Sequence, residues 1–243
     1  NDNLNVFASV STAYRGGGFD GTSIFSVEET QPFDSEEVLA YEAGARYTSD
    51  RINLTFDLFS YDFEDMQATA RLANDTNGRA NVGEATVRGA EASIAITLYE
   101  ASDHKLTFNT AGTYLDTEIT EFSSNRASDV ASTIGDPLPG SPEWSQTAAL
   151  NYQTSFPGNT LFNARLDYSY HGEESNRLNA GDGNTAPSYS LLGVRADLTF
   201  ANGLNVYAYG RNITDEVYFL ELNAGARLVG APEIYGAGIR YEF

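Results

Sequence analysis

Apolar and polar residues alternate with a period of two along the whole chain, and this pattern constrains the fold more than any other feature. Strands of ordinary globular proteins average about 5 to 6 residues, whereas a tilted strand that crosses a bilayer needs about 9 to 11. No segment has convincing helical periodicity. The pattern predicts ten strands of about 11 to 17 residues each, at 3–14, 36–48, 51–64, 82–98, 105–116, 142–154, 159–170, 188–200, 204–214 and 231–243.

Short and long connections alternate between these predicted strands. The short ones are rich in Gly, Pro, Asn and Asp, as tight turns require: TSD (48–50), YEASDH (99–104), SFPGN (155–159) and ANG (201–203). Every other connection is much longer. An outer-membrane β-barrel has short periplasmic turns and long outer loops, whereas a β-sandwich has no reason to collect all its long loops at one end. The chain is therefore predicted to be all-β, as a transmembrane antiparallel barrel wall.

Composition excludes several other classes of protein. With 34 acidic against 14 basic residues, the net charge of −20 would repel a phosphate backbone, so nucleic acid is not an expected partner. The absence of Cys rules out disulfides, thiolate metal sites and a Cys nucleophile. No apolar run approaches the roughly 18 residues of a membrane helix.

The alternation separates each strand into two chemically different faces. Ile52, Leu54, Phe56 and Leu58 share one face, and the residues between them are polar. In the fourth strand the apolar set runs from Ala90 to Leu98 at even positions. An Arg in mid-bilayer costs about 2 to 4 kcal/mol, so the polar faces are expected to line an interior. Two features fit this scheme less well: Arg88 has the parity of the apolar set, and segment 204–214 changes character midway.

Six motifs follow one another along the chain, and the last is an alternating segment that ends in Phe243. They are AYRGGGFDG (13–21), YEAGARYTSDRINLTFDLFSYDFEDMQ (41–67), GRANVGEATVRGAEAS (78–93), GDPLPGSPEW (135–144), YGRNITDEVYF (209–219) and GAPEIYGAGIRYEF (230–243). In this order they resemble the C-terminal part of the β-barrel of TonB-dependent outer-membrane receptors. The resemblance covers essentially the entire chain.

This resemblance implies a 22-stranded barrel in the Gram-negative outer membrane, of which residues 1–243 would be the C-terminal portion with the last ten strands. It implies a plug domain and a TonB-contacting segment outside this sequence, through which the TonB-ExbB-ExbD system would act. The chain lacks a signal peptide and opens as though inside a strand, which favours a fragment or processed piece. Lipid and lipopolysaccharide would surround the wall. The resemblance also implies that Tyr235, Ile239, Tyr241 and Phe243 form the assembly signal recognised by the barrel insertion machinery.

The expected activity is transport of a small-molecule ligand, such as a ferric siderophore or similar chelate, a carbohydrate or cobalamin. Arg binds anionic groups in bidentate fashion, and aromatic rings bind sugars or aromatic chelators. The ligand-contacting candidates in the long loops are Tyr14, Arg15, Phe19, Arg71, Arg79 and Arg177. For any one of these residues, the competing interpretation is an ordinary solvent-exposed loop side chain that does not contact a ligand.

No cofactor, metal site or catalytic residue is expected. His171, with Asp167 four residues before it, is the one candidate for a catalytic base. Asp182 and Asn184 have the spacing of calcium ligands but lack a closing Glu, which favours an ordinary turn. Two alternatives remain open: a self-contained ten-stranded outer-membrane barrel with an enzymatic or adhesive role, and a secreted acidic β-sandwich that binds carbohydrate.

Overall fold

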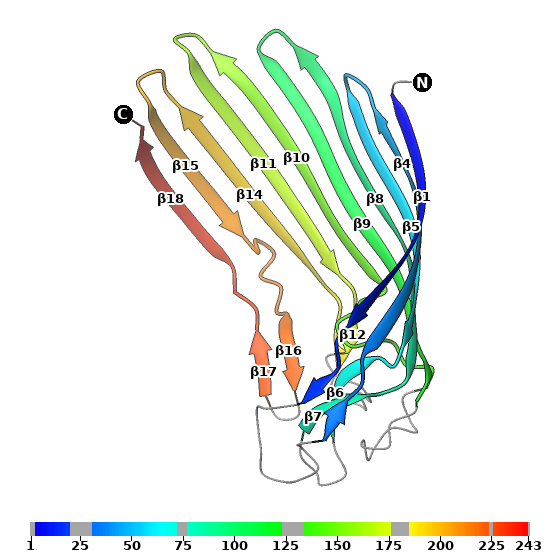
Figure 1. Cartoon of the computed structure of the whole chain (residues 1–243). Coiled ribbons are helices and arrows are strands. Elements are labelled where there is room, and N and C mark those ends of the chain that lie inside the picture. The colour runs from blue at the N-terminus through cyan, green and yellow to red at the C-terminus, as the bar shows by residue number, and fades with distance from the viewer. Residues whose placement is uncertain are drawn as a thin grey trace.

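Ten long strands form one antiparallel sheet in the computed structural model, which describes residues 3–19, 31–71, 77–122, 134–175, 185–223 and 226–242. Each strand pairs with its neighbour along the chain, so the order across the sheet follows the sequence (Figure 1). The all-β antiparallel prediction is confirmed. The strands are β1 (Leu4–Arg15), β4 (Glu36–Thr48), β5 (Ile52–Glu64), β8 (Glu84–Ala101), β9 (His104–Glu121), β10 (Trp144–Phe156), β11 (Thr160–His171), β14 (Tyr189–Thr199), β15 (Leu204–Arg211) and β18 (Ile234–Tyr241).

The long connections contain short hairpins that the periodicity did not predict. They pair β2 (Gly18–Phe19) with β3 (Pro32–Phe33), β6 (Gln67–Arg71) with β7 (Asn77–Asn81), β12 (Glu174–Ser175) with β13 (Thr185–Ala186), and β16 (Phe219–Asn223) with β17 (Ala226–Val229). Figure 1 shows these hairpins at one end of the sheet, with the tight turns and both termini at the other. The predicted alternation of short and long connections is confirmed.

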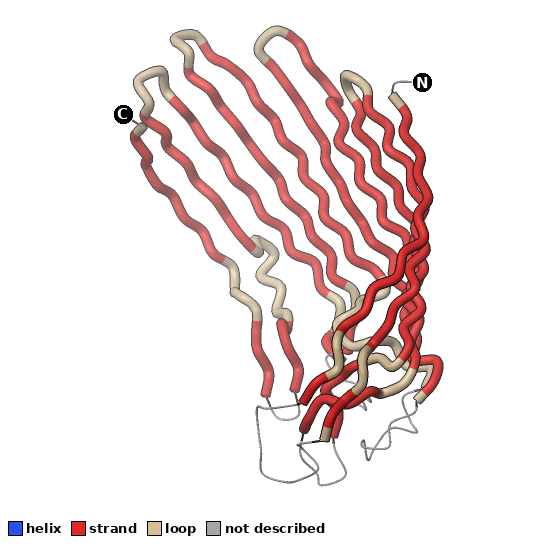
Figure 2. The backbone as a smooth tube through the Cα atoms, viewed as in Figure 1, coloured by secondary structure: helices blue, strands red, loops and turns tan. Residues whose placement is uncertain are grey.

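The sheet is open in the part of the chain that the structure describes. β1 and β18 lie at its two edges and do not pair with each other, and the other four sheets among the described residues are the two-stranded hairpins of the long connections. Both a self-contained ten-stranded barrel and a β-sandwich are therefore wrong. Strands dominate the backbone (Figure 2), and the described residues contain no helix that is both long and apolar enough to cross a membrane.

Two predicted strands differ from the observed ones because of a β-bulge. β8 and β9 extend to Ala101 and His104, so their connection shortens to Ser102 and Asp103. The register shifts between Thr97 and Tyr99, which places Tyr99 opposite Leu106 and leaves Leu98 as the extra residue. A bulge inserts one residue into one strand only. The strict period of two therefore ends at Leu98, and Tyr99 takes the position opposite Leu106.

The change of character in segment 204–214 has a structural cause at Asn212. β15 ends at Arg211, and Asn212 follows with a positive φ of 47°. The Asn212 side chain is buried at 6% exposure; its Oδ1 accepts the Glu216 amide, and its Nδ2 donates to the carbonyls of Glu216 and Ala231. This amide ties the two chain segments together above the sheet, so β18 begins at Ile234 rather than at 231.

Arg88 is accommodated at the long-loop end of the wall. Its cross-strand neighbours are Ser60 on β5 and Asp116 on β9. A basic residue directly opposite an acidic one is favourable in a sheet. Toward the long loops, positions with the parity of the apolar face therefore carry polar residues.

The chain buries few apolar side chains, as expected of a wall rather than a globular domain. A small cluster of Met66, Val82 and Ala85 lies near the long loops, with Phe63 and Leu138 packed beside it. By contrast, Val6 is 70% exposed and Ile239 is 74% exposed. In a membrane barrel such side chains meet lipid.

Candidate functional site: the polar face of the wall

The register places polar side chains of neighbouring strands beside one another on one face of the sheet. We call this the polar face; in β11 and β14 it carries the odd-numbered residues. Arg165 lies directly opposite Arg195, and Asn163 lies opposite Asp197. The opposite, apolar face carries rows such as Phe162, Leu198, Val206 and Ile239. The predicted separation into two faces is therefore present in the three-dimensional register.

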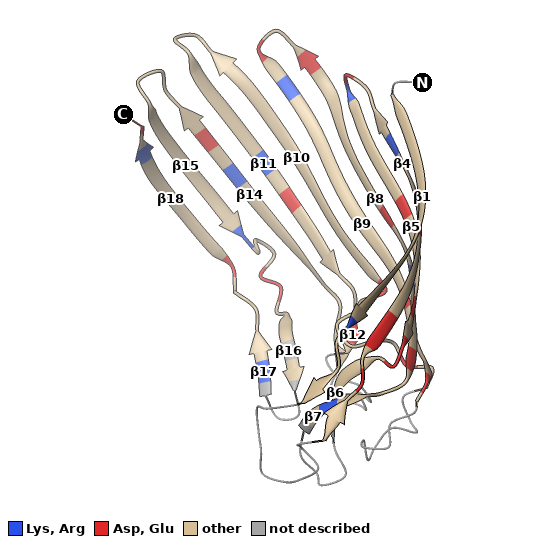
Figure 3. Ribbon diagram, in the orientation of Figure 1, with Lys and Arg blue, Asp and Glu red and all other residues tan. Residues whose placement is uncertain are grey.

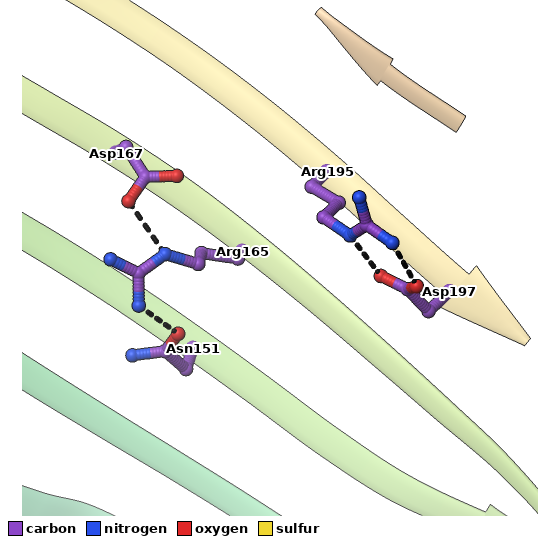
Figure 4. A network of polar contacts seen from close by, with 5 residues as sticks. All are labelled: Asn151, Arg165, Asp167, Arg195 and Asp197. Carbon is purple, nitrogen blue, oxygen red and sulfur yellow. Dashed lines mark hydrogen bonds and ion pairs between the residues drawn. The ribbon is translucent and has the colours of Figure 1, made fainter. Parts of the chain in front are cut away.

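Two Arg-x-Asp pairs form the centre of this face (Figures 3 and 4). In β11, Arg165 donates from Nε to Asp167 at 2.6 Å and from Nη1 to Asn151 on β10 at 2.9 Å. In β14, Arg195 binds Asp197 in bidentate fashion, with distances of 2.7 and 2.6 Å. Residues two apart on a strand share a face, so each Asp can reach the Arg that precedes it.

The aspartates compensate for a like-charge contact. Two arginines directly opposite on adjacent strands repel each other, and each has its own counter-ion within its strand. The Asp197 side chain is 19% exposed, and the Asp167 side chain is 42% exposed, so the β14 pair is the better shielded. Because all four groups retain contact with solvent, these ion pairs fix side-chain orientation more than they add to stability.

Tyrosines complete the polar face next to β18. The Arg195 guanidinium lies 4.5 Å from the ring centroid of Tyr207, and that of Arg211 lies 5.3 Å from Tyr209. The rings of Tyr207 and Tyr209 cover Gly238 and Gly236 on β18. A Cβ at position 236 would come within 2.6 Å of the Tyr209 ring, so glycine is required for this close packing.

A cavity of about 870 Å³ opens over this face. Three arginines and Asp167 are among its lining residues; with Asp197, which binds Arg195, the balance of these groups is one positive charge. In the described residues, no group of His, Cys, Asp or Glu is arranged to hold a metal ion. The arrangement suits reversible binding of polar or anionic groups through hydrogen bonds. Its lining includes Asn53, Thr55, Asn109, Arg165, Arg195 and Arg211.

A network of polar side chains joins the bases of the first two long loops. Gln67 donates from Nε2 to the carbonyls of Gly16 and Asp34 at 3.1 and 2.9 Å, and its backbone amide donates to Glu36 at 2.6 Å. Asn81 donates to the carbonyls of Asp34 and Asp65 and accepts the Asp34 amide. These bonds hold the β2–β3 and β6–β7 hairpins in a fixed relation at the long-loop end.

The predicted ligand-contacting residues are distributed over these hairpins. Tyr14 is 79% exposed and has apolar-face parity, whereas Arg15 has polar-face parity and lies opposite Glu36. Phe19 in β2 is 71% exposed, and Arg79 in β7 lies opposite Thr69. The backbone of Arg71 pairs with Asn77. Arg177 and Asp182 lie outside the described residues.

The predicted assembly signal follows the apolar face of β18. Tyr235, Ile239 and Tyr241 share one parity and are 63%, 74% and 50% exposed, while Phe243 lies outside the described residues. His171 does not form the suggested pair with Asp167: its Nε2 lies 3.2 Å from Glu174, and Asp167 is bound to Arg165.

Sequence analysis did not predict the paired arginines as a unit. The signal is nonetheless present, because RLD (165–167) and RAD (195–197) repeat Arg-x-Asp at polar positions of neighbouring strands. What the sequence could not supply is the register that places Arg165 opposite Arg195.

A family model described as TonB dependent receptor-like, beta-barrel, matches residues 1–213. Among solved structures, the ferric yersiniabactin uptake receptor FyuA from Yersinia pestis superposes with a TM-score of 0.81 at 19% identity, over 100% of this chain and 35% of that one. The ferric-catecholate import receptor Fiu from K12 E. coli gives 0.69 at 18% identity, over 100% and 33%. The copper transporter OprC gives 0.69 at 14% identity, over 100% and 38%.

The chain therefore spans about a third of the length of these structures. No curated protein sequence matches it significantly.

Proposed function

The chain belongs to the TonB-dependent receptor β-barrel family, and we propose that it forms the C-terminal portion of the barrel wall of a receptor that takes up a scarce nutrient. Proteins of this family reside in the outer membrane of Gram-negative bacteria and act as receptors or transporters rather than enzymes. Residues 1–243 would form one part of a larger barrel, of about 22 strands. A plug domain outside this sequence would connect it to the TonB-ExbB-ExbD system.

The observation that best supports transport is the two-faced wall with a positively charged cavity. An apolar face suits lipid, and the polar face offers guanidinium, amide and phenol groups to a passing solute. The arginines are oriented by in-strand aspartates, and an anionic ligand would have to compete with these carboxylates for them. This chemistry suits weak, successive contacts along a translocation path.

The ligand is proposed to be a ferric siderophore or similar chelate, with a carbohydrate or cobalamin as the alternatives. The likeness to receptors named for ferric yersiniabactin and ferric catecholate motivates this order. Tyr14, Arg15, Phe19, Arg71, Arg79 and Arg177 are the proposed ligand contacts in the long loops. Tyr235, Ile239, Tyr241 and Phe243 are proposed as the signal read by the insertion machinery, and lipopolysaccharide as the outer neighbour of the wall.

Uptake measurements in the host test this proposal. A strain that lacks the gene is expected to lose accumulation of one labelled nutrient among ferric chelates, cobalamin and oligosaccharides, and the intact gene should restore it. Disruption of TonB, or a protonophore, should abolish the same uptake. Accumulation that persists without TonB would contradict energy-coupled transport and favour a passive pore.

A further inference from the structure

The three arginines that line the cavity over the polar face differ in whether a carboxylate neutralises them. Arg165 is bound to Asp167, and Arg195 is bound to Asp197, each at 2.6 Å. Arg211 lines the same cavity but forms no ion pair with any residue that the structure describes. The one positive charge that is left over among these groups therefore belongs to Arg211.

The backbone of Arg211 is held on both sides, although its side chain is exposed. Arg211 is the last residue of β15. Before it, Gly210 pairs with Val194 on β14 and with Tyr235 on β18. After it, the buried amide of Asn212 bonds to backbone groups of two other chain segments. The guanidinium therefore extends toward the cavity from a fixed position.

The ring of Tyr209 orients this guanidinium without neutralising it. The central carbon of the Arg211 guanidinium lies 5.3 Å from the centroid of the Tyr209 ring, and both residues line the cavity. A cation over an aromatic ring is attracted by the negative face of the ring. This contact uses the flat face of the guanidinium, so the N–H donors along its edge are free to form a bidentate contact with an anion.

The wall of the cavity has room for the uncharged part of a ligand. Gly193 has no side chain, and a Cβ at this position would meet no heavy atom closer than 3.5 Å. Ala149 adds another small side chain to the lining. Asn109 and Thr147 line the cavity as well and offer neutral donors and acceptors. A polar ligand can therefore contact the wall closely while Arg211 binds its charged group.

The charge balance limits how much negative charge the ligand can carry. A carboxylate fits the fork of a guanidinium in bidentate fashion and carries a single charge, which matches the charge of Arg211. A phosphate dianion or a polyanionic chelate would leave negative charge uncompensated close to Asp167 and Asp197, and repulsion would disfavour its binding. The described lining therefore favours a ligand with one carboxylate.

We propose that Arg211 recognises the ligand of this cavity by binding a single carboxylate group. Arg165 and Arg195 shape the site, but their own aspartates compete with an anion for them. The inference rests on the proposed function for the role of the cavity in uptake, whereas the binding itself is measured without transport. Carboxylate binding at Arg211 in a receptor whose uptake does not need TonB would overturn the proposed function and leave this inference standing.

The test titrates the purified, detergent-solubilised receptor with three probes that share a polyol chain and differ in charge. Gluconate carries one carboxylate, sorbitol is neutral, and sorbitol 6-phosphate carries a phosphate. Saturation-transfer NMR measures the three dissociation constants. Gluconate is expected to bind about tenfold or more tightly than sorbitol, because a charge-assisted bidentate contact is added. It should also bind more tightly than sorbitol 6-phosphate.

Substitutions of Arg211 separate its contribution from the general charge of the wall. Arg211→Gln should weaken gluconate binding about tenfold or more and leave sorbitol binding unchanged. Arg211→Lys keeps the charge without the planar fork, so it should restore only part of the loss. The matched control is Arg240→Gln. Arg240 lies opposite Asn205 at the other end of β15, about 20 Å from Arg211, where salt screens its charge, and the variant should bind like the parent.

A further substitution tests whether pairing decides which arginine binds. Asp197→Asn would release Arg195 from its carboxylate and add a second positive charge to the balance. Binding of sorbitol 6-phosphate should then strengthen about threefold or more. An unchanged affinity for this dianion would overturn the claim that the aspartates silence the other arginines.

The proposal is overturned if gluconate binds no more tightly than sorbitol, or if Arg211→Gln binds gluconate like the parent. An equal loss in Arg240→Gln would also overturn it, because the effect would then come from overall charge. If Arg211→Gln does not fold, Arg211→Lys and the comparison of the three probes in the parent decide the same question.

Discussion

At the residue scale, two glycines on β18 are required because tyrosine rings from β15 occupy the space that a side chain would fill. Tyr209 covers Gly236, where a Cβ would lie 2.6 Å from the ring. On β14, a Cβ at Gly193 would meet no heavy atom closer than 3.5 Å. The two glycines lie on the same face of the wall and differ in whether a neighbour occupies the space. They therefore form a matched pair for substitution.

Gly236→Ala is expected to lower the free energy of unfolding by about 1 to 3 kcal/mol, because the Tyr209 ring must leave its packed position. Gly193→Ala should remain within about 0.5 kcal/mol of the parent. Urea unfolding in lipid vesicles, followed by the gel shift of folded barrels, measures both. Equal effects of the two substitutions would show that ring packing over glycine is unimportant here.

The buried amide of Asn212 is a second residue on which the structure depends. It makes three hydrogen bonds to backbone groups of Glu216 and Ala231 and adopts a φ of 47°. Asn212→Gly should cost about 1 to 3 kcal/mol, because the buried backbone groups lose their partner while the φ angle stays accessible.

Asn212→Ala should cost a further increment of about 1 kcal/mol, because a left-handed backbone is strained for Ala. Urea midpoints of the two variants measure the difference. If Asn212→Ala were as stable as Asn212→Gly, strain at this position would be refuted, and if both matched the parent, the hydrogen bonds would be dispensable.

At the element scale, alternation in sequence predicted the strands well and their irregularities poorly. Each long strand follows from a period-two run. The register is strongly specified, because a shift of one residue would move all apolar side chains of a strand to the polar face. The bulge at Leu98 and the four short hairpins follow instead from contacts between strands and loops. The pairing of Arg165 with Arg195 likewise depends on register. Single-strand patterns cannot contain this information.

The bulge leads to a prediction about a deletion. Removing Leu98 should let β8 and β9 pair without interruption, with Tyr99 still opposite Leu106. The deletion protein should fold into membranes with nearly the yield of the parent. Deletion of Ile94 is the matched control, because restoring the register would turn Ile96 from the apolar to the polar face. Folded fractions and protease resistance compare the two, and equal loss in both would refute the assignment of Leu98 as the extra residue.

At the scale of the whole molecule, the distribution of apolar and charged residues differs between the two faces of the wall and also along its length. Across the wall, the apolar rows oppose the arginine–aspartate centre. Along it, acidic residues gather toward the long-loop end, including the segment between β15 and β16 (Figure 3). The described lining of the cavity over the polar face includes three arginines, whereas acidic residues line a cavity at the long-loop end. A solute that enters from the long loops would therefore meet acidic residues before it reaches the arginine–aspartate centre.

The orientation of the wall is tested by placing the same charge on each face of one strand. Val206 and Asn205 are adjacent in β15; Val206 lies in the apolar row with Leu198 and Ile239, whereas Asn205 bonds to Thr199 on the polar face. Val206→Arg is expected to reduce the free energy of folding into bilayers by about 2 to 4 kcal/mol, because a guanidinium would enter hydrocarbon. Asn205→Arg should cost less than about 1 kcal/mol, because the side chain stays in a wet interior. Reversible folding into lipid vesicles measures both values, and an equal or reversed order would show that the apolar face does not meet lipid, which the membrane assignment requires.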